Sequence, residues 1–169
     1  MCLAQVGQDQ LDKPCPCDQW SIRDLLSHVI GGNIRVAGAE FTGLLPEVEL
    51  GIQYEDSSRL AIERFERPGA LSDTFKAPFG EIPGSIFIVL RTTDVLVHSW
   101  DLARANGENS DFEPELASEV LEVSAKIIRP DLRGPGRPFA PEVLTDPSAS
   151  PMARLVAFLG RDPYWGESG

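Results

Sequence analysis

The sequence has few of the cysteines and histidines on which disulfide-stabilised proteins and zinc-finger proteins depend. Of its 169 residues only three are cysteines and two are histidines. The cysteines, Cys2, Cys15 and Cys17, all lie near the N-terminus, so none has a distant partner for a disulfide framework and we expect reduced thiols. Cys15-Pro16-Cys17 also lacks the second pair of ligands that a cysteine-based zinc site requires.

Basic residues are scarce, with 15 Lys and Arg against 26 Asp and Glu, and the net charge is −11. Such a charge repels nucleic-acid phosphates and anionic lipid surfaces, so we expect no nucleic-acid partner and no membrane partner. The first residues, Met1 to Lys13, do not have a basic start followed by an apolar stretch. The purest apolar run, Ile86 to Leu90, is too short to cross a bilayer. A cytoplasmic protein is therefore expected.

What is present is the composition of an ordinary globular protein. Hydrophobic residues make up 42% of the chain and charged residues 24%, which is close to the average for folded domains. A length of 169 residues is enough to bury a core without disulfides or metals as staples. We therefore expect a single domain over residues 1–169.

Apolar residues recur mostly at helical spacing, which predicts an all-α fold. Between the helices, 71–83 is expected to be a loop with at most a minor extended element, and the Pro/Gly-rich segment 129–147 a loop before the last helix. The predicted helices are one that begins at about Trp20 and either stops at Gly31-Gly32 or continues past it, and then 56–67, 85–106, 113–128 and 151–159.

The long predicted helix 85–106 carries charge on its apolar stripe. Asp94, His98 and Asp101 share a face about 100° wide with apolar residues. A carboxylate that faces a core needs a cation, hydrogen-bond donors or solvent. Asp94 and His98 are spaced i, i+4, so that both side chains reach one ion. The chain's other histidine, His28, lies at the edge of the apolar face of the first predicted helix.

Two histidines and a carboxylate are typical ligands of a catalytic zinc site that keeps one position open, and nickel or iron also accept them. The pattern therefore predicts a divalent metal held by His28, Asp94 and His98. The alternative is that Asp94 and His98 make only a local hydrogen bond on the helix.

Other polar and aromatic residues are candidates for contacts with a substrate or cofactor, each with a structural alternative. Asp101 either orients a ligand or substrate, or lies at the solvent edge of the stripe. Arg104 either orients the substrate or pairs with an acid, since it projects away from the stripe. Asn33 is a turn residue or a pocket contact. Trp20 is a core anchor or a substrate platform.

Three motifs resemble the DinB-like superfamily in its mycothiol-dependent maleylpyruvate isomerase branch: Pro16 to Asn33, Asp94 to Ala105, and Leu159 to Pro163, the last typical of an actinobacterial subgroup. The family motif usually has glycine where Gln19 stands. The resemblance implies a DinB/YfiT-like four-helix bundle, a divalent metal on His28, Asp94 and His98, and a homodimer.

The leading functional expectation is a metal-dependent thiol (mycothiol-type) S-transferase or isomerase. A low-molecular-weight thiol would occupy the open metal position as a thiolate and attack a small electrophilic substrate. Asp101 and Arg104 would orient the substrate, and Asn33 and Trp20 would contact the bound cofactor. Two rivals remain open, a metal-dependent hydrolase and a non-catalytic accessory protein that binds metal or a small ligand.

Overall fold

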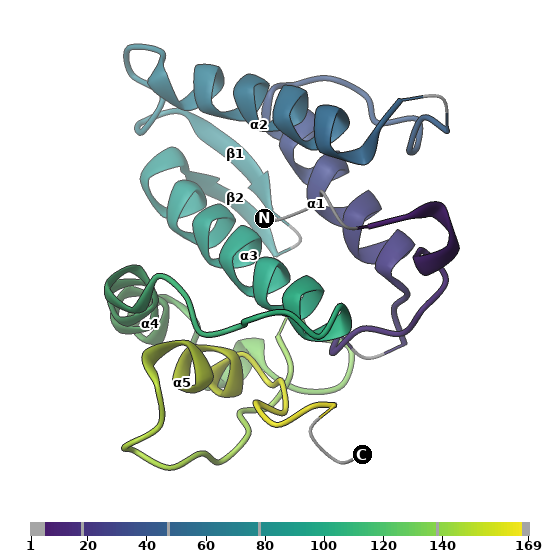
Figure 1. Cartoon of the computed structure of the whole chain (residues 1–169). Coiled ribbons are helices and arrows are strands. Elements are labelled where there is room, and N and C mark those ends of the chain that lie inside the picture. Colours follow the sequence, from purple (N-terminus) through teal and green to yellow (C-terminus); the bar gives the residue numbers. More distant parts are fainter. Residues whose placement is uncertain (1–5, 18, 47, 78, 138, 167–169) are drawn as a thin grey trace. The chain divides into compact units, whose positions relative to one another are not determined.

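The protein is mostly helical, with one small two-stranded sheet (Figure 1). The computed structural model describes residues 6–17, 19–46, 48–77, 79–137 and 139–166, which fall into two compact units, 1–88 and 89–169. No helix in the part of the chain described is long and apolar enough to cross a membrane. The elements are the short 3₁₀ helix η1 (Gln8–Gln10), α1 (Ile22–Val36), α2 (Leu50–Glu66), β1 (Thr74–Ala77), β2 (Gly80–Pro83), α3 (Gly84–Ala105), α4 (Pro114–Ile127), the short 3₁₀ helix η2 (Pro130–Leu132) and α5 (Pro151–Phe158).

Helix α1 begins at a capping box and runs past the two glycines at its middle. The Ser21 hydroxyl accepts a hydrogen bond from the Asp24 backbone N–H at 3.2 Å, and the Asp24 carboxylate accepts one from the Ser21 N–H at 2.9 Å. Gly31 lies where a Cβ would come within 2.6 Å of the Phe41 ring. Of the two ends considered for this helix, the later one is correct, because glycine serves close packing here rather than a stop.

Helix α2 lies beside α1 in the first unit (Figure 1). It begins at Leu50, six residues before the predicted start. The prediction missed this start because the N-cap residue Glu49 makes no side-chain capping bond, and its residue type does not mark a helix start in the sequence. The buried amide of Asn33 on α1 donates to the hydroxyls of Ser57 and Ser58 on α2, at 3.2 and 3.1 Å. A polar contact therefore joins the two helices through their interface.

The segment predicted to be loop or extended forms a hairpin. Strands β1 and β2 pair antiparallel, with Phe75 opposite Ile82. Phe75 stacks on Phe87 at the start of α3, with ring centroids 4.8 Å apart, and a smaller core of the first unit gathers around it. Gly84 begins α3 where a Cβ would lie 2.1 Å from the carbonyl oxygen of Ala70, so the helix can start this close to the turn before β1 only with glycine.

The second unit is built on apolar faces of the rest of α3, α4 and α5. Helices α4 and α5 pack against each other (Figure 1). This core contains Leu96, Val97, Trp100, Ala117, Val120, Ile128, Met152, Leu155, Val156 and Leu159. This core holds the three helices together, since each large apolar side chain that is fully buried contributes about 1.5–3 kcal/mol.

The described residues of the Pro/Gly-rich segment before α5 form a loop, as predicted, apart from the short turn η2. Arg133 anchors it by donating to the carbonyls of Ala140 and Phe158 at 3.0 and 2.8 Å. The Val143 N–H donates to the Ala157 carbonyl at 2.9 Å. The Arg133 side chain and one backbone hydrogen bond therefore hold the loop against α5.

Candidate metal centre

Asp94 and His98 lie one turn apart on α3, and their side chains face each other. The Nε2 atom of His98 is 3.5 Å from Oδ1 of Asp94. The His98 side chain is 5% exposed and that of Asp94 29%, so this pair borders solvent only on the carboxylate side. Arg91, one turn before Asp94, donates to the other carboxylate oxygen of Asp94. The i, i+4 spacing thus produces the predicted donor pair, one imidazole nitrogen and one carboxylate oxygen.

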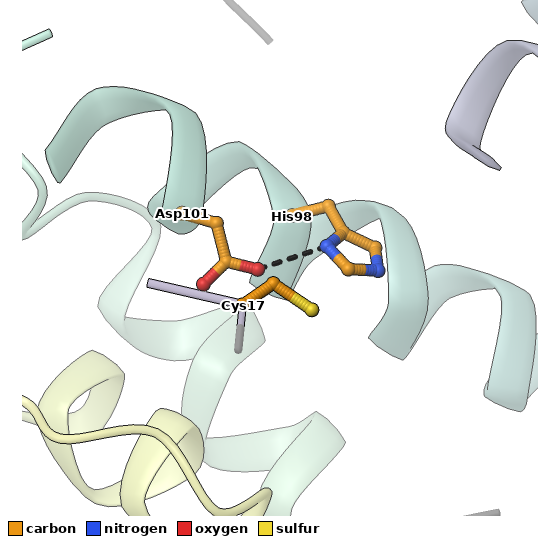
Figure 2. A group of neighbouring side chains, drawn as sticks. All are labelled: Cys17, His98 and Asp101. Atoms are coloured by element: carbon orange, nitrogen blue, oxygen red, sulfur yellow. Dashed lines mark hydrogen bonds and ion pairs between the residues drawn. The ribbon is translucent and has the colours of Figure 1, made fainter. Parts of the chain in front are cut away.

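The second nitrogen of His98 is held by Asp101. Nδ1 lies 2.8 Å from Oδ2 of Asp101, whose side chain is fully buried (Figure 2). When Nδ1 carries the proton and donates it to this carboxylate, the lone pair of the neutral ring is on Nε2, the atom nearer to Asp94. Metal-binding histidines in proteins are commonly oriented in this way by a carboxylate on the far nitrogen.

The surroundings of His98 favour positive charge. Burial by itself lowers the pKa of His98, but the hydrogen bonds and negative charges of Asp101 and Asp94 outweigh it, and the pKa stands above its usual value. The same two carboxylates would stabilise a cation bound at Nε2. The donor types and the charge at this turn of α3 therefore fit a divalent ion such as zinc.

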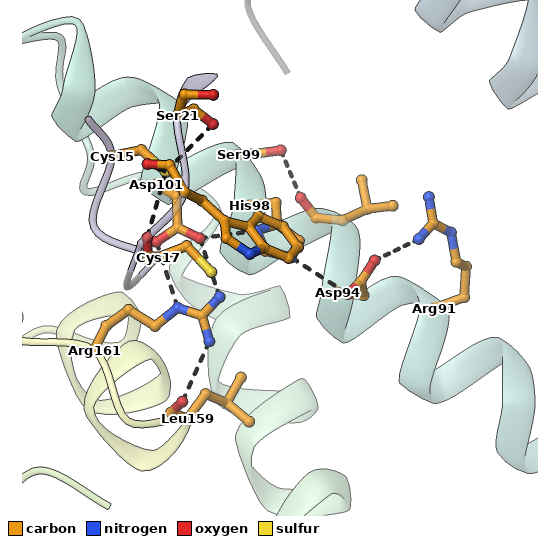
Figure 3. A network of polar contacts seen from close by, with 12 residues as sticks. Cys15, Cys17, Ser21, Arg91, Asp94, His98, Ser99, Asp101, Leu159 and Arg161 are labelled. Atoms are coloured by element: carbon orange, nitrogen blue, oxygen red, sulfur yellow. Dashed lines mark hydrogen bonds and ion pairs between the residues drawn. The ribbon is translucent and has the colours of Figure 1, made fainter. Parts of the chain in front are cut away.

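Arg161, which sequence reasoning missed, completes the cluster on α3. Its guanidinium donates to both carboxylate oxygens of Asp101, from Nε at 3.4 Å and from Nη2 at 3.1 Å (Figure 3). Asp101 therefore has a cation and an imidazole as partners, which resolves its two predicted positions in favour of the buried one. The signal available in the sequence was the motif Leu159 to Pro163, whose arginine had no assigned role.

His28 and Trp20 lie together in the first unit. Their ring centroids are 5.0 Å apart with planes tilted by 52°, and His28 is half-buried on α1. Trp20 is thus packed on an imidazole that was predicted to be a metal ligand. Whether His28 joins Asp94 and His98 stays a prediction.

The other two candidates are engaged in contacts within their own units. The Asn33 amide bonds to α2, as described above. The Arg104 guanidinium donates from Nε to the Trp165 carbonyl at 3.1 Å and lies 5.8 Å from the ring centre of Trp100. These contacts hold Arg104 against the C-terminal segment of the second unit. Roles for Asn33 and Arg104 at a substrate remain predictions.

Cys15 and Cys17 form no disulfide in the part of the chain that the structure describes. The Cys15 thiol is buried and donates to the Trp20 carbonyl oxygen at 3.4 Å. It helps hold the turn that leads into α1. Cys2 lies outside the described residues.

Comparison with known proteins places the chain in a family. Two Mycobacterium tuberculosis proteins, Uncharacterized protein MT0763 of strain CDC 1551 / Oshkosh and Uncharacterized protein Rv0738 of strain ATCC 25618 / H37Rv, are each 46% identical to it over 162 residues, which is 94% of this chain and 89% of theirs. Residues 1–50 match the mycothiol maleylpyruvate isomerase N-terminal domain. The chain belongs to this mycothiol maleylpyruvate isomerase N-terminal domain family.

The match to the mycothiol maleylpyruvate isomerase N-terminal domain includes Trp20, His28 and Asn33 and ends before Asp94 and His98. The family thus supports the motif around α1, while the donor pair on α3 is supported by its own geometry. No solved structure matches the chain.

Proposed function

We propose that this member of the mycothiol maleylpyruvate isomerase family is a metal-dependent thiol S-transferase or isomerase for a small electrophilic substrate. Its metal would be a divalent ion, zinc in the first place, with nickel and iron as alternatives. The ligands would be His28, Asp94 and His98. The observation that carries the proposal is His98 itself, with one ring nitrogen held by buried Asp101 and the other turned toward Asp94.

A bound divalent ion would supply one piece of chemistry, a lowered pKa for a thiol such as mycothiol at the open position. The residues of the chain would do the rest. Asp101 would keep Nε2 of His98 aimed at the ion, and Arg91 would fix the rotamer of Asp94 through its hydrogen bond. Trp20, Asn33 and Arg104 are the residues proposed to contact thiol or substrate. In a transfer, the thiol sulfur bonds to an electrophilic carbon and the leaving group departs with the electron pair.

Two structural proposals accompany this function. The first is that the helices form the family's four-helix bundle as a single domain over residues 1–169, which one cooperative unfolding transition of the full chain would support. The second is a reducing, cytoplasmic location, where the thiols of Cys15 and Cys17 would stay reduced.

The first experiment is metal analysis of protein purified without a nickel column. The wild type should carry about one zinc per chain, and His28→Ala, Asp94→Ala and His98→Ala should each lose most of it, since each removes a ligand. Asp56→Ala, which removes an exposed carboxylate on α2, is the matched control and should retain the metal. A metal-free wild type that binds no added zinc, cobalt or nickel would contradict the proposal.

Activity is tested with mycothiol and an alkyl halide dye as the electrophile. Turnover that requires both the thiol and the metal supports S-transfer. Hydrolysis of an ester or amide substrate without any thiol would favour the metal-dependent hydrolase. Stable metal binding without turnover would favour the accessory protein.

A further inference from the structure

Arg161 lies just past the end of α5, in a motif to which the proposed function assigns no role. Its guanidinium meets the Asp101 carboxylate with two nitrogens, at 3.4 and 3.1 Å, and its third nitrogen, Nη1, donates to the Leu159 carbonyl at 3.3 Å (Figure 3). All three nitrogens are thereby engaged. A guanidinium held at three points presents a fixed fork to the carboxylate.

The backbone at the end of α5 determines where this fork lies. Gly160 has a φ of +86°, and a Cβ there would come within 2.5 Å of the Ala140 Cβ. The Arg161 N–H then donates to the Val156 carbonyl at 2.9 Å, which closes the helix end. Glycine in the left-handed region therefore directs the next side chain back toward α3.

We propose that Arg161 is a positioning residue for the metal ligand His98 and acts through Asp101. This inference rests on the proposed function, because it takes His98 as a ligand. In the chain of contacts, Arg161 holds the Asp101 carboxylate in one rotamer, and that carboxylate holds Nδ1 of His98. Nε2 is then presented to the ion in a fixed direction, and little orientational freedom is lost when metal binds.

The burial of Asp101 is the reason that a cation matters here. Its side chain is fully buried, whereas that of Arg161 is 18% exposed. Removal of the guanidinium would leave a buried carboxylate without the positive charge that faces it, which is strongly unfavourable. Asp101 would turn toward other donors, and the His98 ring would lose its fixed orientation. Residues that support a metal ligand in this way typically change metal affinity 10–100-fold when they are mutated.

The competing explanation is that Arg161 only fastens the C-terminal segment to the second unit. Arg133 provides a matched control, because it fastens the neighbouring loop through the carbonyls of Ala140 and Phe158 in the same unit. If Arg161 has only a structural role, Arg161→Met and Arg133→Met should both lower the thermal midpoint and leave zinc affinity unchanged. If Arg161 positions His98, only Arg161→Met should weaken zinc binding.

The test measures the zinc Kd of the full-length protein by chelator competition, with the thermal midpoint recorded for each variant. Arg161→Met should weaken zinc binding about 10–100-fold. Arg161→Lys keeps the charge but not the fork and should recover part of that loss. Arg133→Met should lower the thermal midpoint and leave the zinc Kd near the wild-type value. As a second measurement, imidazole ¹⁵N shifts of the metal-free protein, recorded at a pH where the ring is neutral, should show one His98 tautomer, protonated at Nδ1, in the wild type and a mixture in Arg161→Met.

The outcomes separate the two proposals. If wild type binds zinc, and Arg161→Met binds it equally well with an unchanged His98 tautomer, this inference is wrong and the metal site stands. If wild type binds no zinc, the proposed function is wrong, and the inference that depends on it is overturned as well.

Discussion

Gln19 occupies a backbone conformation that suits glycine. Its φ is +62°, in the turn where the Trp20 N–H donates to the Cys17 carbonyl at 3.1 Å. A side chain in this region costs about 1–2 kcal/mol, which glycine avoids. We expect Gln19→Gly to raise the free energy of unfolding by about 1 kcal/mol after its greater entropy in the unfolded state is subtracted. Urea denaturation measures this change.

Gln8→Gly is the control for this substitution. Gln8 is likewise exposed but does not have a positive φ, so glycine there should be neutral or destabilising. Equal effects of the two variants would contradict the explanation from backbone strain. The same conformation accounts for the glycine that the family motif usually has at this position.

Asp101 carries a fully buried carboxylate in the second unit. Asp101→Asn removes the charge that faces Arg161 and replaces one of the two carboxylate oxygens, which bond to His98 and Arg161, with an NH2 group that cannot accept. We expect the free energy of unfolding to fall by about 1.5–3 kcal/mol, the usual value for hydrogen bonds to charged groups. Asp56→Asn, at an exposed site on α2, should stay within about 0.5 kcal/mol of wild type. Urea denaturation in a chelator, which keeps bound metal out of the comparison, measures both variants.

At the scale of the element, the capping box of α1 lends itself to a direct test. Ser21→Ala removes the hydroxyl that accepts from the Asp24 N–H and should cost about 1 kcal/mol of stability. Ser118→Ala is the control, since the Ser118 hydroxyl only bonds back to the Pro114 carbonyl on the exposed face of α4. The free energies of unfolding of the two variants, measured by thermal or urea denaturation, should differ by most of the cap's value of about 1 kcal/mol.

The capping box also has a predictable dependence on pH. Hydrogen bonds from the Ser21 hydroxyl and backbone hold the pKa of Asp24 below its ordinary value of 3.8. The stabilisation is therefore complete above that value and is lost as the pH falls through the lower pKa of the folded state. The difference in unfolding midpoint between wild type and Asp24→Asn should thus narrow from pH 6 to pH 3. A constant difference would contradict the role of the charge.

The helices could be predicted where the sequence marks their ends. Ser21, the N-cap of α1, marks its start to within about two residues of the predicted one, and Gly107, directly after the predicted helix 85–106, marks the end of α3 equally well. The start of α2 could not be predicted, because Glu49 caps it without a side-chain bond. The hairpin was foreseen only as a minor extended element, because its strands have four residues each and gain stability from Phe75 packing on Phe87.

In the candidate site, contacts within one helix could be predicted from the sequence, whereas contacts between distant segments could not. The pairing of Asp94 with His98 follows from i, i+4 spacing on one helix, and so it could be predicted. Arg161 contacts Asp101 across 60 positions of sequence, which no periodicity reveals. Asn33 was predicted to be a turn residue or a pocket contact, and its hydrogen bonds to Ser57 and Ser58 could not be predicted because those residues lie on another helix.

At the scale of the whole molecule, metal binding should appear as stability. A ligand that binds only the folded state adds about 2.7 kcal/mol at a concentration of 100 times its Kd. We therefore expect added zinc to raise the thermal midpoint of the chelator-treated protein. His98→Ala should abolish this rise, and an equal rise in that variant would point to zinc bound elsewhere. Differential scanning calorimetry with buffered zinc is the measurement.

The association state is a second whole-molecule prediction. We propose a homodimer, as the family resemblance implies, and so light scattering should give twice the chain mass of 18.5 kDa. A mass that stays at the single-chain value up to high protein concentration would contradict it.

At two glycines described above, Gly84 at the start of α3 and Gly160 at the end of α5, a Cβ would collide with a backbone carbonyl oxygen. Neither touches the proposed metal, yet both should resist evolutionary drift as strongly as the ligands do. In a set of diverged relatives we expect them to stay fixed while the surface of α2 changes freely. A search pattern that combines them with His98 should therefore recover distant members that overall identity no longer detects.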